Sequence, residues 1–105
     1  MKEEEAKYEY GGRNTQTFAK LQGFKNLIVW QKASDLSNLV HEATKHFGPG
    51  NYRLIDQMRG AAISITANIA EGYWSASFGN YIRYCLTARG SAGELGSYVQ
   101  DCELW

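Results

Sequence analysis

Two glutamates are the side chains in this sequence best suited to acid–base chemistry. Glu71 and Glu94 fall in two separate helical stretches, and paired carboxylates are common general acids and bases. The sequence offers no companion nucleophile or metal-ligand set for them. We therefore interpret both first as members of a polar seam between helices. A hydrolase or nuclease that uses the two carboxylates is the alternative.

The histidines do not form a metal site. His41 and His46 are five residues apart, which places them about 140° apart around a helix, so they cannot share a metal from one face. Lys45 stands where a HExxH motif needs its second histidine. No phosphate-binding loop, dinucleotide fingerprint, serine-nucleophile motif or CxxC pair occurs. We predict no catalytic, cofactor-binding or metal-binding residue, no cofactor, and a protein that is not an enzyme.

Positive and negative charges balance, with 11 lysines and arginines against 11 aspartates and glutamates. A dedicated nucleic-acid binder usually has a basic excess, because contacts to phosphates supply much of its affinity. A local basic patch stays open as an alternative. The candidate nucleic-acid contacts are Lys25, Lys32, Lys45, Arg53, Arg59, Arg83 and Arg89, with Tyr73, Trp74 and Tyr84 as candidate stacking side chains. The simpler interpretation is solvated faces and interhelical ion pairs, such as Arg59 with Glu71 or Glu94.

The sequence carries no recognisable export or membrane signal. Its acidic start, MKEEEAK, is not a signal peptide, and its apolar runs are too short or too polar to span a bilayer. Cys85 and Cys102 should lie about 25 Å apart on one helix, too far for a disulfide. We predict a soluble cytoplasmic protein whose two thiols are small hydrophobic side chains in a reducing compartment.

Three helical stretches must position these residues. Residues 1–23 show no periodicity, so we expect a flexible segment there and a helical bundle domain over 24–105. The first helix is predicted over about 25–47, before the sequence GPGN at 48–51 ends it. Its apolar stripe is Val29, Ala33, Leu36, Val40, Ala43 and Phe47.

The second helix is predicted over 52–72, with Gly72 as its C-terminal cap. It carries an apolar stripe of Leu54, Met58, Ala62, Ile65 and Ile69 beside a small or polar stripe of Gln57, Ala61, Ser64, Asn68 and Glu71. A helix with both stripes can pack closely against a neighbour and offer hydrogen bonds across the contact.

The third helix is predicted from about Ser77, with Ser75 or Ser77 as its N-cap, to the end of the chain. Its apolar stripe is Phe78, Tyr81, Cys85, Ala88, Ala92, Leu95, Val99 and Cys102. We interpret Gly90, Gly93 and Gly96 as points where another helix approaches closely, opposite Ala61 and Ser64; kinking or fraying is the alternative.

The second and third helices should share a structural polar seam, since buried polar groups must find partners. Its predicted members are Gln57, Ser64, Asn68, Glu71, Ser91 and Glu94. Three such helices leave an apolar groove. A fourth helix, another subunit or the N-terminal segment would fill it.

Three blocks of the sequence resemble the four-helix-bundle protein family, also known as 23S rRNA-intervening sequence or ribosomal S23-type proteins. They are FKNLIVWQKASDL (24–36), YRLIDQMRGAAISITANIAEG (52–72) and YIRYCLTARGSAGEL (81–95). The resemblance implies an all-α, antiparallel up-down bundle that assembles into a homopentamer and associates with RNA or a ribonucleoprotein. The family's members are encoded inside intervening sequences of bacterial rRNA genes.

A related branch implies a different partner. It is the accessory variability determinant of diversity-generating retroelements, which binds a reverse transcriptase and, through a basic surface, nucleic acid, either RNA or DNA. The present sequence departs from the family in two respects: no fourth helix follows the third, and the chain is neutral where that branch is basic. We expect self-association, candidate RNA or DNA binding and no membrane partner.

Overall fold

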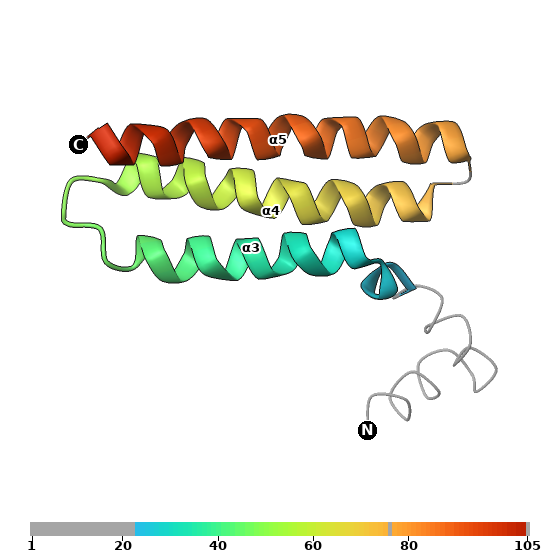
Figure 1. Cartoon of the computed structure of the whole chain (residues 1–105), viewed down its shortest axis with the longest axis horizontal. Coiled ribbons are helices and arrows are strands. Elements are labelled where there is room, and N and C mark those ends of the chain that lie inside the picture. Colours follow the sequence, from blue (N-terminus) through green and yellow to red (C-terminus); the bar gives the residue numbers. More distant parts are fainter. Residues whose placement is uncertain (1–22, 76, 105) are drawn as a thin grey trace, which may run out of the picture.

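The described part of the chain consists of three antiparallel α-helices (Figure 1). The computed structural model describes residues 23–75 and 77–104. A short 3-10 turn, η1 (Gly23–Asn26), precedes α3 (Ile28–Thr44), α4 (Tyr52–Trp74) and α5 (Phe78–Leu104). The all-α prediction is confirmed. The four-helix bundle is not, since the described residues contain three α-helices. The predicted flexible segment lies outside the described residues, apart from Gly23.

The middle helix α4 packs against both neighbours and supplies most of the core (Figure 1). Its predicted apolar stripe is confirmed: Met58, Ala62, Ile65 and Ile69 are buried, and Leu54 is half-buried against them. The other buried apolar side chains are Ala33 and Val40 of α3, Ala61 of α4, and Ala88 and Leu95 of α5.

The outer helices bury less than their apolar stripes predict. On α3, Val29 is 50% exposed and Leu36 is 37% exposed. On α5, Phe78 and Val99 are exposed as well. Each outer helix contacts mainly α4, so only the side facing α4 is covered. The stripes identify apolar faces correctly, but part of each face lies outside the core.

Helix α3 ends at Thr44, three residues before the predicted end. The amides of Lys45, His46 and Phe47 bond to carbonyls three residues earlier, which tightens the last turn. The loop then passes through Gly50, whose φ of 93° suits glycine. The predicted GPGN stop is therefore confirmed, with the regular helix ending slightly earlier.

The turn between α4 and α5 is built by two serines. The Ser75 hydroxyl donates to the Gly72 carbonyl at 2.7 Å, and α4 continues past Gly72 to Trp74, so the prediction of Gly72 as the terminal cap is wrong. The Ser77 hydroxyl accepts the Asn80 amide at 3.0 Å. Ser77 therefore satisfies an amide at the start of α5, as an N-cap serine does.

The two cysteines are free and half-buried, as expected from their spacing. The Cys102 thiol lies 3.9 Å from the Met58 sulfur, where it packs at the edge of the core. None of the helices in the described ranges combines the length and apolarity needed to cross a bilayer.

Candidate functional site

The contact between α4 and α5 gathers most of the predicted polar seam. The Ser64 and Ser91 hydroxyls share a hydrogen bond of 2.8 Å. The Asn68 amide donates to the Ser64 carbonyl at 2.8 Å and to its hydroxyl at 3.1 Å. Small side chains let the two helices approach, and the hydroxyls join them. This part of the seam fixes the register between α4 and α5.

A tyrosine that the sequence analysis missed completes the seam toward the end of α5. The Tyr98 hydroxyl lies 2.8 Å from Gln57 Oε1 and 3.0 Å from Glu94 Oε2. The hydrogen bond to the Glu94 carboxylate raises the pKa of Tyr98, because ionisation would remove the donor. Tyr98 lies one helical turn after Glu94, and this spacing was the available sequence signal.

An open depression lies beside this seam. It has a volume of about 320 Å³ and is lined by Asp56, Gln57, Gly60, Ala61, Ser64 and Glu94. Its charged side chains are carboxylates. Within the described residues, no three histidines, cysteines, aspartates or glutamates are grouped in a way that could hold a metal ion.

The structure separates the two glutamates of the catalytic alternative. Ser64 lies opposite Ser91, and Gly72 lies against Tyr84. Glu71 is therefore level with the Tyr84 region of α5, about 15 Å along the axis from Glu94. The hypothesis of a Glu71–Glu94 acid–base pair is wrong, and Glu71 takes no part in the seam hydrogen bonds described above.

Helices α4 and α5 approach each other closely at Gly72. A Cβ atom there would lie 2.8 Å from Tyr84 Cβ and 3.2 Å from Tyr81 Cδ1. Burial raises the pKa of Tyr81, and a hydrogen bond with Cys85 raises it further. Gly72 thus has a packing role that the sequence analysis missed, although its place in the small-residue helix was a signal.

The glycines of α5 have the opposite environment. A Cβ atom added at Gly90, Gly93 or Gly96 would meet nothing within 4 Å. The prediction that these glycines allow α4 to approach closely is wrong. Periodicity shows that they interrupt a helix, but it does not show which way they face.

Several of the seven candidate nucleic-acid cations make contacts within the bundle, and Arg83 donates a hydrogen bond to Asn80 Oδ1 on its own helix. Arg59 Nε donates to the Thr44 hydroxyl at 2.8 Å, and its Nη2 donates to the His41 carbonyl at 3.3 Å. Arg59 thereby ties α4 to the end of α3, and the predicted ion pair with Glu71 or Glu94 is wrong. Lys45 forms an exposed ion pair of 3.1 Å with Glu42, and its hydrogen bond lowers the pKa of that carboxyl.

The charges of the described residues separate along the bundle axis. One end comprises residues 23–36, 64–74 and 78–91, and it holds four cations and two acids. The other end comprises residues 37–63 and 92–104, and it holds three cations and five acids. The four cations of the first end are Lys25, Lys32, Arg83 and Arg89. The neutral chain thus has a basic end and an acidic end.

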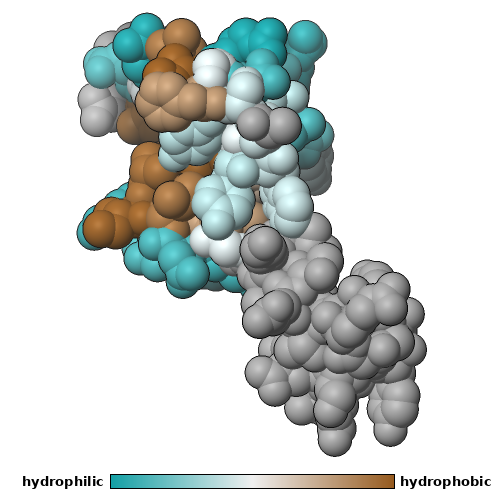
Figure 2. Space-filling view, turned by 90° about the vertical axis from the view of Figure 1, so that its right-hand side faces the viewer, coloured by the Kyte–Doolittle hydropathy of each residue, from teal (hydrophilic) through white to brown (hydrophobic). Residues whose placement is uncertain are grey.

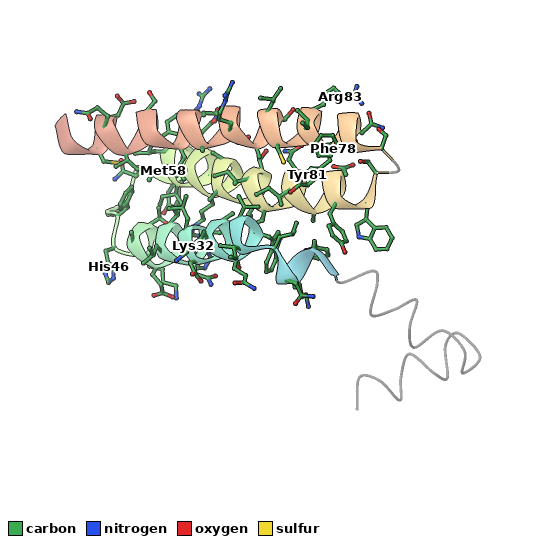
Figure 3. The ribbon with its side chains drawn as sticks, turned by 45° about the vertical axis from the view of Figure 1, so that its right-hand side comes forward. Lys32, His46, Met58, Phe78, Tyr81 and Arg83 are labelled. Carbon is green, nitrogen blue, oxygen red and sulfur yellow. The ribbon has the colours of Figure 1, made fainter. Side chains whose placement is uncertain are left out.

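The basic end also exposes aromatic side chains. Tyr73 and Trp74 finish α4, Phe78 begins α5, and all three are substantially exposed. Phe78 and Arg83 lie in the first turns of α5, at the end of the bundle where α4 finishes (Figure 3). Cations beside exposed rings can contact phosphates and stack on bases.

Apolar side chains are exposed on both outer helices. Viewed toward the basic end, Figure 2 shows two separate brown areas, the upper over α5 and the lower over α3. Their largest exposed members are Phe78 at 76% and Ile28 at 71%. Exposed apolar area of this kind marks interaction surfaces.

Comparison with known proteins gives one family. The family model described as 23S rRNA-intervening sequence protein matches residues 25–103, which include all three α-helices except the last residue of α5. No curated protein and no solved structure matches the chain.

Proposed function

Because the chain belongs to the 23S rRNA-intervening sequence protein family, we propose that it is a homo-oligomeric helical-bundle protein associated with RNA or a ribonucleoprotein. The match over residues 25–103 is the observation that carries this proposal. We further propose that the protein acts in the cytoplasm and does not catalyse a reaction.

The polar seam supports a structural role for Glu94, one of the two glutamates suited to acid–base chemistry. The Ser64 hydroxyl bonds to the Ser91 hydroxyl and accepts from the Asn68 amide. The Tyr98 hydroxyl donates to Gln57 and Glu94. Hydrogen-bonded groups of this kind hold helices in register.

The exposed apolar side chains support self-association. Phe78 and Leu86 on α5, and Ile28 and Leu39 on α3, are each at least half exposed. Covering this surface with further copies would remove apolar area from water. The number of five subunits that the resemblance implies stays a prediction.

The basic end supports the proposed RNA association. Its four cations outnumber its acids, and Tyr73 and Trp74 are exposed beside them. The acidic end would repel phosphates. The positive and negative charges of the described residues balance overall, whereas the related branch that binds a reverse transcriptase is basic. The charge separation therefore does not favour a reverse-transcriptase partner.

RNA binding is tested with a fluorescein-labelled, single-stranded 20-nucleotide RNA and the full chain at low salt. Replacing Lys25 and Lys32 at the basic end with glutamine should weaken binding about fivefold and flatten its salt dependence. The matched control replaces Lys45 and Arg53 at the acidic end with glutamine and should change affinity less than twofold. Absence of binding, or equal effects of both variants, would contradict the proposed RNA surface.

A further inference from the structure

Helix α5 carries a small open depression at the basic end of the bundle. It has a volume of about 270 Å³ and is lined by Arg83, Tyr84 and Thr87. The arginine and the threonine are exposed, and the tyrosine is half-buried. The depression therefore brings together a guanidinium, an aromatic ring and a hydroxyl. These are groups that contact the phosphate, the base and the ribose of a nucleotide.

The Arg83 guanidinium is anchored on its own helix and keeps donors for a ligand. Arg83 projects from the first turns of α5 (Figure 3), and its Nη2 donates to Asn80 Oδ1. A guanidinium has a planar fork of N–H donors, so the others remain for a phosphate. Within the described residues Arg83 pairs with no carboxylate, and α5 carries no acid before Glu94. A phosphate can therefore bind Arg83 without displacing an acid.

The Tyr84 side chain is fixed where it leaves the helix. Its Cβ lies so close to Gly72 of α4 that a Cβ added at the glycine would be 2.8 Å away. The ring that borders the depression thus starts from a packed position. Aromatic rings stack on bases of any sequence. Because bases inside a duplex are already stacked and paired, the bases that reach such a ring are unpaired ones.

The Thr87 hydroxyl is oriented by its own helix. It donates to the Arg83 carbonyl at 3.2 Å, so the lone pairs of its oxygen are what it offers to a ligand. A hydroxyl in this state binds a donor. The ribose 2′-hydroxyl is such a donor, and DNA lacks it. Thr87 therefore gives the depression a means to distinguish RNA from DNA.

We propose that this depression binds one unpaired nucleotide of an RNA strand. Arg83 contacts the phosphate, Tyr84 lies against the base, and Thr87 accepts a hydrogen bond from the 2′-hydroxyl. The inference rests on the proposed RNA association and names the class of RNA: a single strand or a loop, not a duplex.

The site is complete within one copy, so it is compatible with any number of subunits, including five. Phe78, which we assign to self-association, lies five residues before Arg83 and nine before Thr87. It is therefore about 140° around the helix from the first and about 180° from the second. In a ring the depression would be repeated, and repetition raises the affinity for a long strand.

The acidic end limits where the strand can run. Glu94 lies eleven residues after Arg83, which is about three turns, so it is on the same side of α5 and about 16 Å farther along the axis. Its carboxylate repels phosphates. The strand therefore leaves the depression toward the basic end, where Tyr73 and Trp74 are exposed.

Fluorescence anisotropy with the full chain and a fluorescein-labelled, single-stranded 20-nucleotide RNA tests the phosphate contact. Arg83→Gln should weaken binding about threefold and lower the slope of log Kd against log salt by about 0.7, the value for one phosphate of a single strand. Arg53→Gln is the matched control, because Arg53 also lines an open depression, but at the acidic end. It should change the affinity less than about twofold. Circular dichroism should show both variants as helical as the original chain.

The base contact is tested by comparing the single strand with a 20-base-pair RNA duplex. Tyr84→Leu keeps the Cβ beside Gly72 and removes the ring. It should weaken binding of the single strand about fivefold and binding of the duplex less than about twofold. Equal weakening for both would contradict recognition of an unpaired base.

The ribose contact is tested with single-stranded DNA of the same sequence. Thr87→Val preserves the shape of the side chain and removes the hydroxyl. It should weaken RNA binding about threefold and leave DNA binding unchanged, because DNA has no 2′-hydroxyl to lose. An unchanged ratio of RNA to DNA affinity would contradict this contact.

The outcomes separate this inference from the proposed function. Absence of RNA binding by the original chain would contradict both. Binding that weakens when Lys25 and Lys32 are replaced with glutamine, but not with Arg83→Gln, would overturn this inference alone. Displacement of the labelled RNA by micromolar adenosine monophosphate would identify a free nucleotide as the ligand and would also overturn it.

Discussion

The inner and outer faces of α5 use glycine in opposite ways. On the inner face, the close approach is made at Gly72 of α4, where the rings of Tyr81 and Tyr84 leave no room for a Cβ atom. On the outer face, Gly93 and Gly96 belong to α5 itself and meet nothing within 4 Å. A glycine therefore indicates close packing only when its position faces a neighbour.

The inner contact is most sensitive at Gly72. Gly72→Ala should lower the free energy of unfolding by about 2 kcal/mol, because the new Cβ would overlap Tyr84 and the helix would have to move away. Urea denaturation measures the change. Gly60→Ala on the same helix is the control and should stabilise slightly, because its position is open. If Gly72→Ala were as stable as Gly60→Ala, the close contact would be disproved.

The next largest effect on the unfolding free energy is expected at the Ser64 and Ser91 hydroxyls of the polar seam. Ser91→Ala removes the 2.8 Å bond to Ser64 and should cost about 1 kcal/mol in unfolding free energy. Ser64 keeps its contact with Asn68, so the cost should stay modest. The double variant with Ser64→Ala should be less destabilised than the sum of the single variants. Strict additivity would mean that the two hydroxyls do not interact.

The outer face should respond with the opposite sign. Gly90→Ala places a methyl group in open space and should stabilise the helix by roughly 0.5 to 1 kcal/mol. Thermal unfolding at a concentration low enough to keep the chain monomeric measures it. A loss of stability would show that Gly90 contacts another part of the monomer.

The smallest effect concerns Tyr98 at the edge of the inner contact. Its pKa is raised in the folded protein by the bond to Glu94, so the stabilisation from this bond is present below the ordinary pKa of tyrosine and lost as pH rises through the folded value. Tyr98→Phe should show a small loss of stability at neutral pH and a flatter decline above pH of about 10. A decline identical to that of the original chain would contradict the Tyr98–Glu94 bond.

Hydropathy and turn residues predicted much of the fold. The apolar stripe of α4 and the stop after α3 are found, and Ser77 is the one of the two proposed N-cap serines that caps α5. Ser64 and Ser91 were expected in one polar seam because buried polar groups must find partners. These features depend on local sequence, which periodicity describes well.

The remaining features depend on the relative rotation of the helices. Arg59 was expected to pair with an acid, but α4 is turned so that it reaches Thr44. The hydroxyl of Thr44, whose residue is 1% exposed, serves as the acceptor. The glycines of α5 were expected to face α4, but α5 is turned so that Gly90, Gly93 and Gly96 face open space. Sequence period defines the faces of a helix, whereas packing decides which face meets which neighbour.

The mass of the full chain in solution tests most directly whether the outer faces of α3 and α5 bind further copies. Sedimentation equilibrium over a range of concentrations measures this mass. Phe78, Leu86, Ile28 and Leu39 expose apolar area to water, so the account predicts a homo-oligomer. A chain that stays monomeric at high concentration would contradict the account.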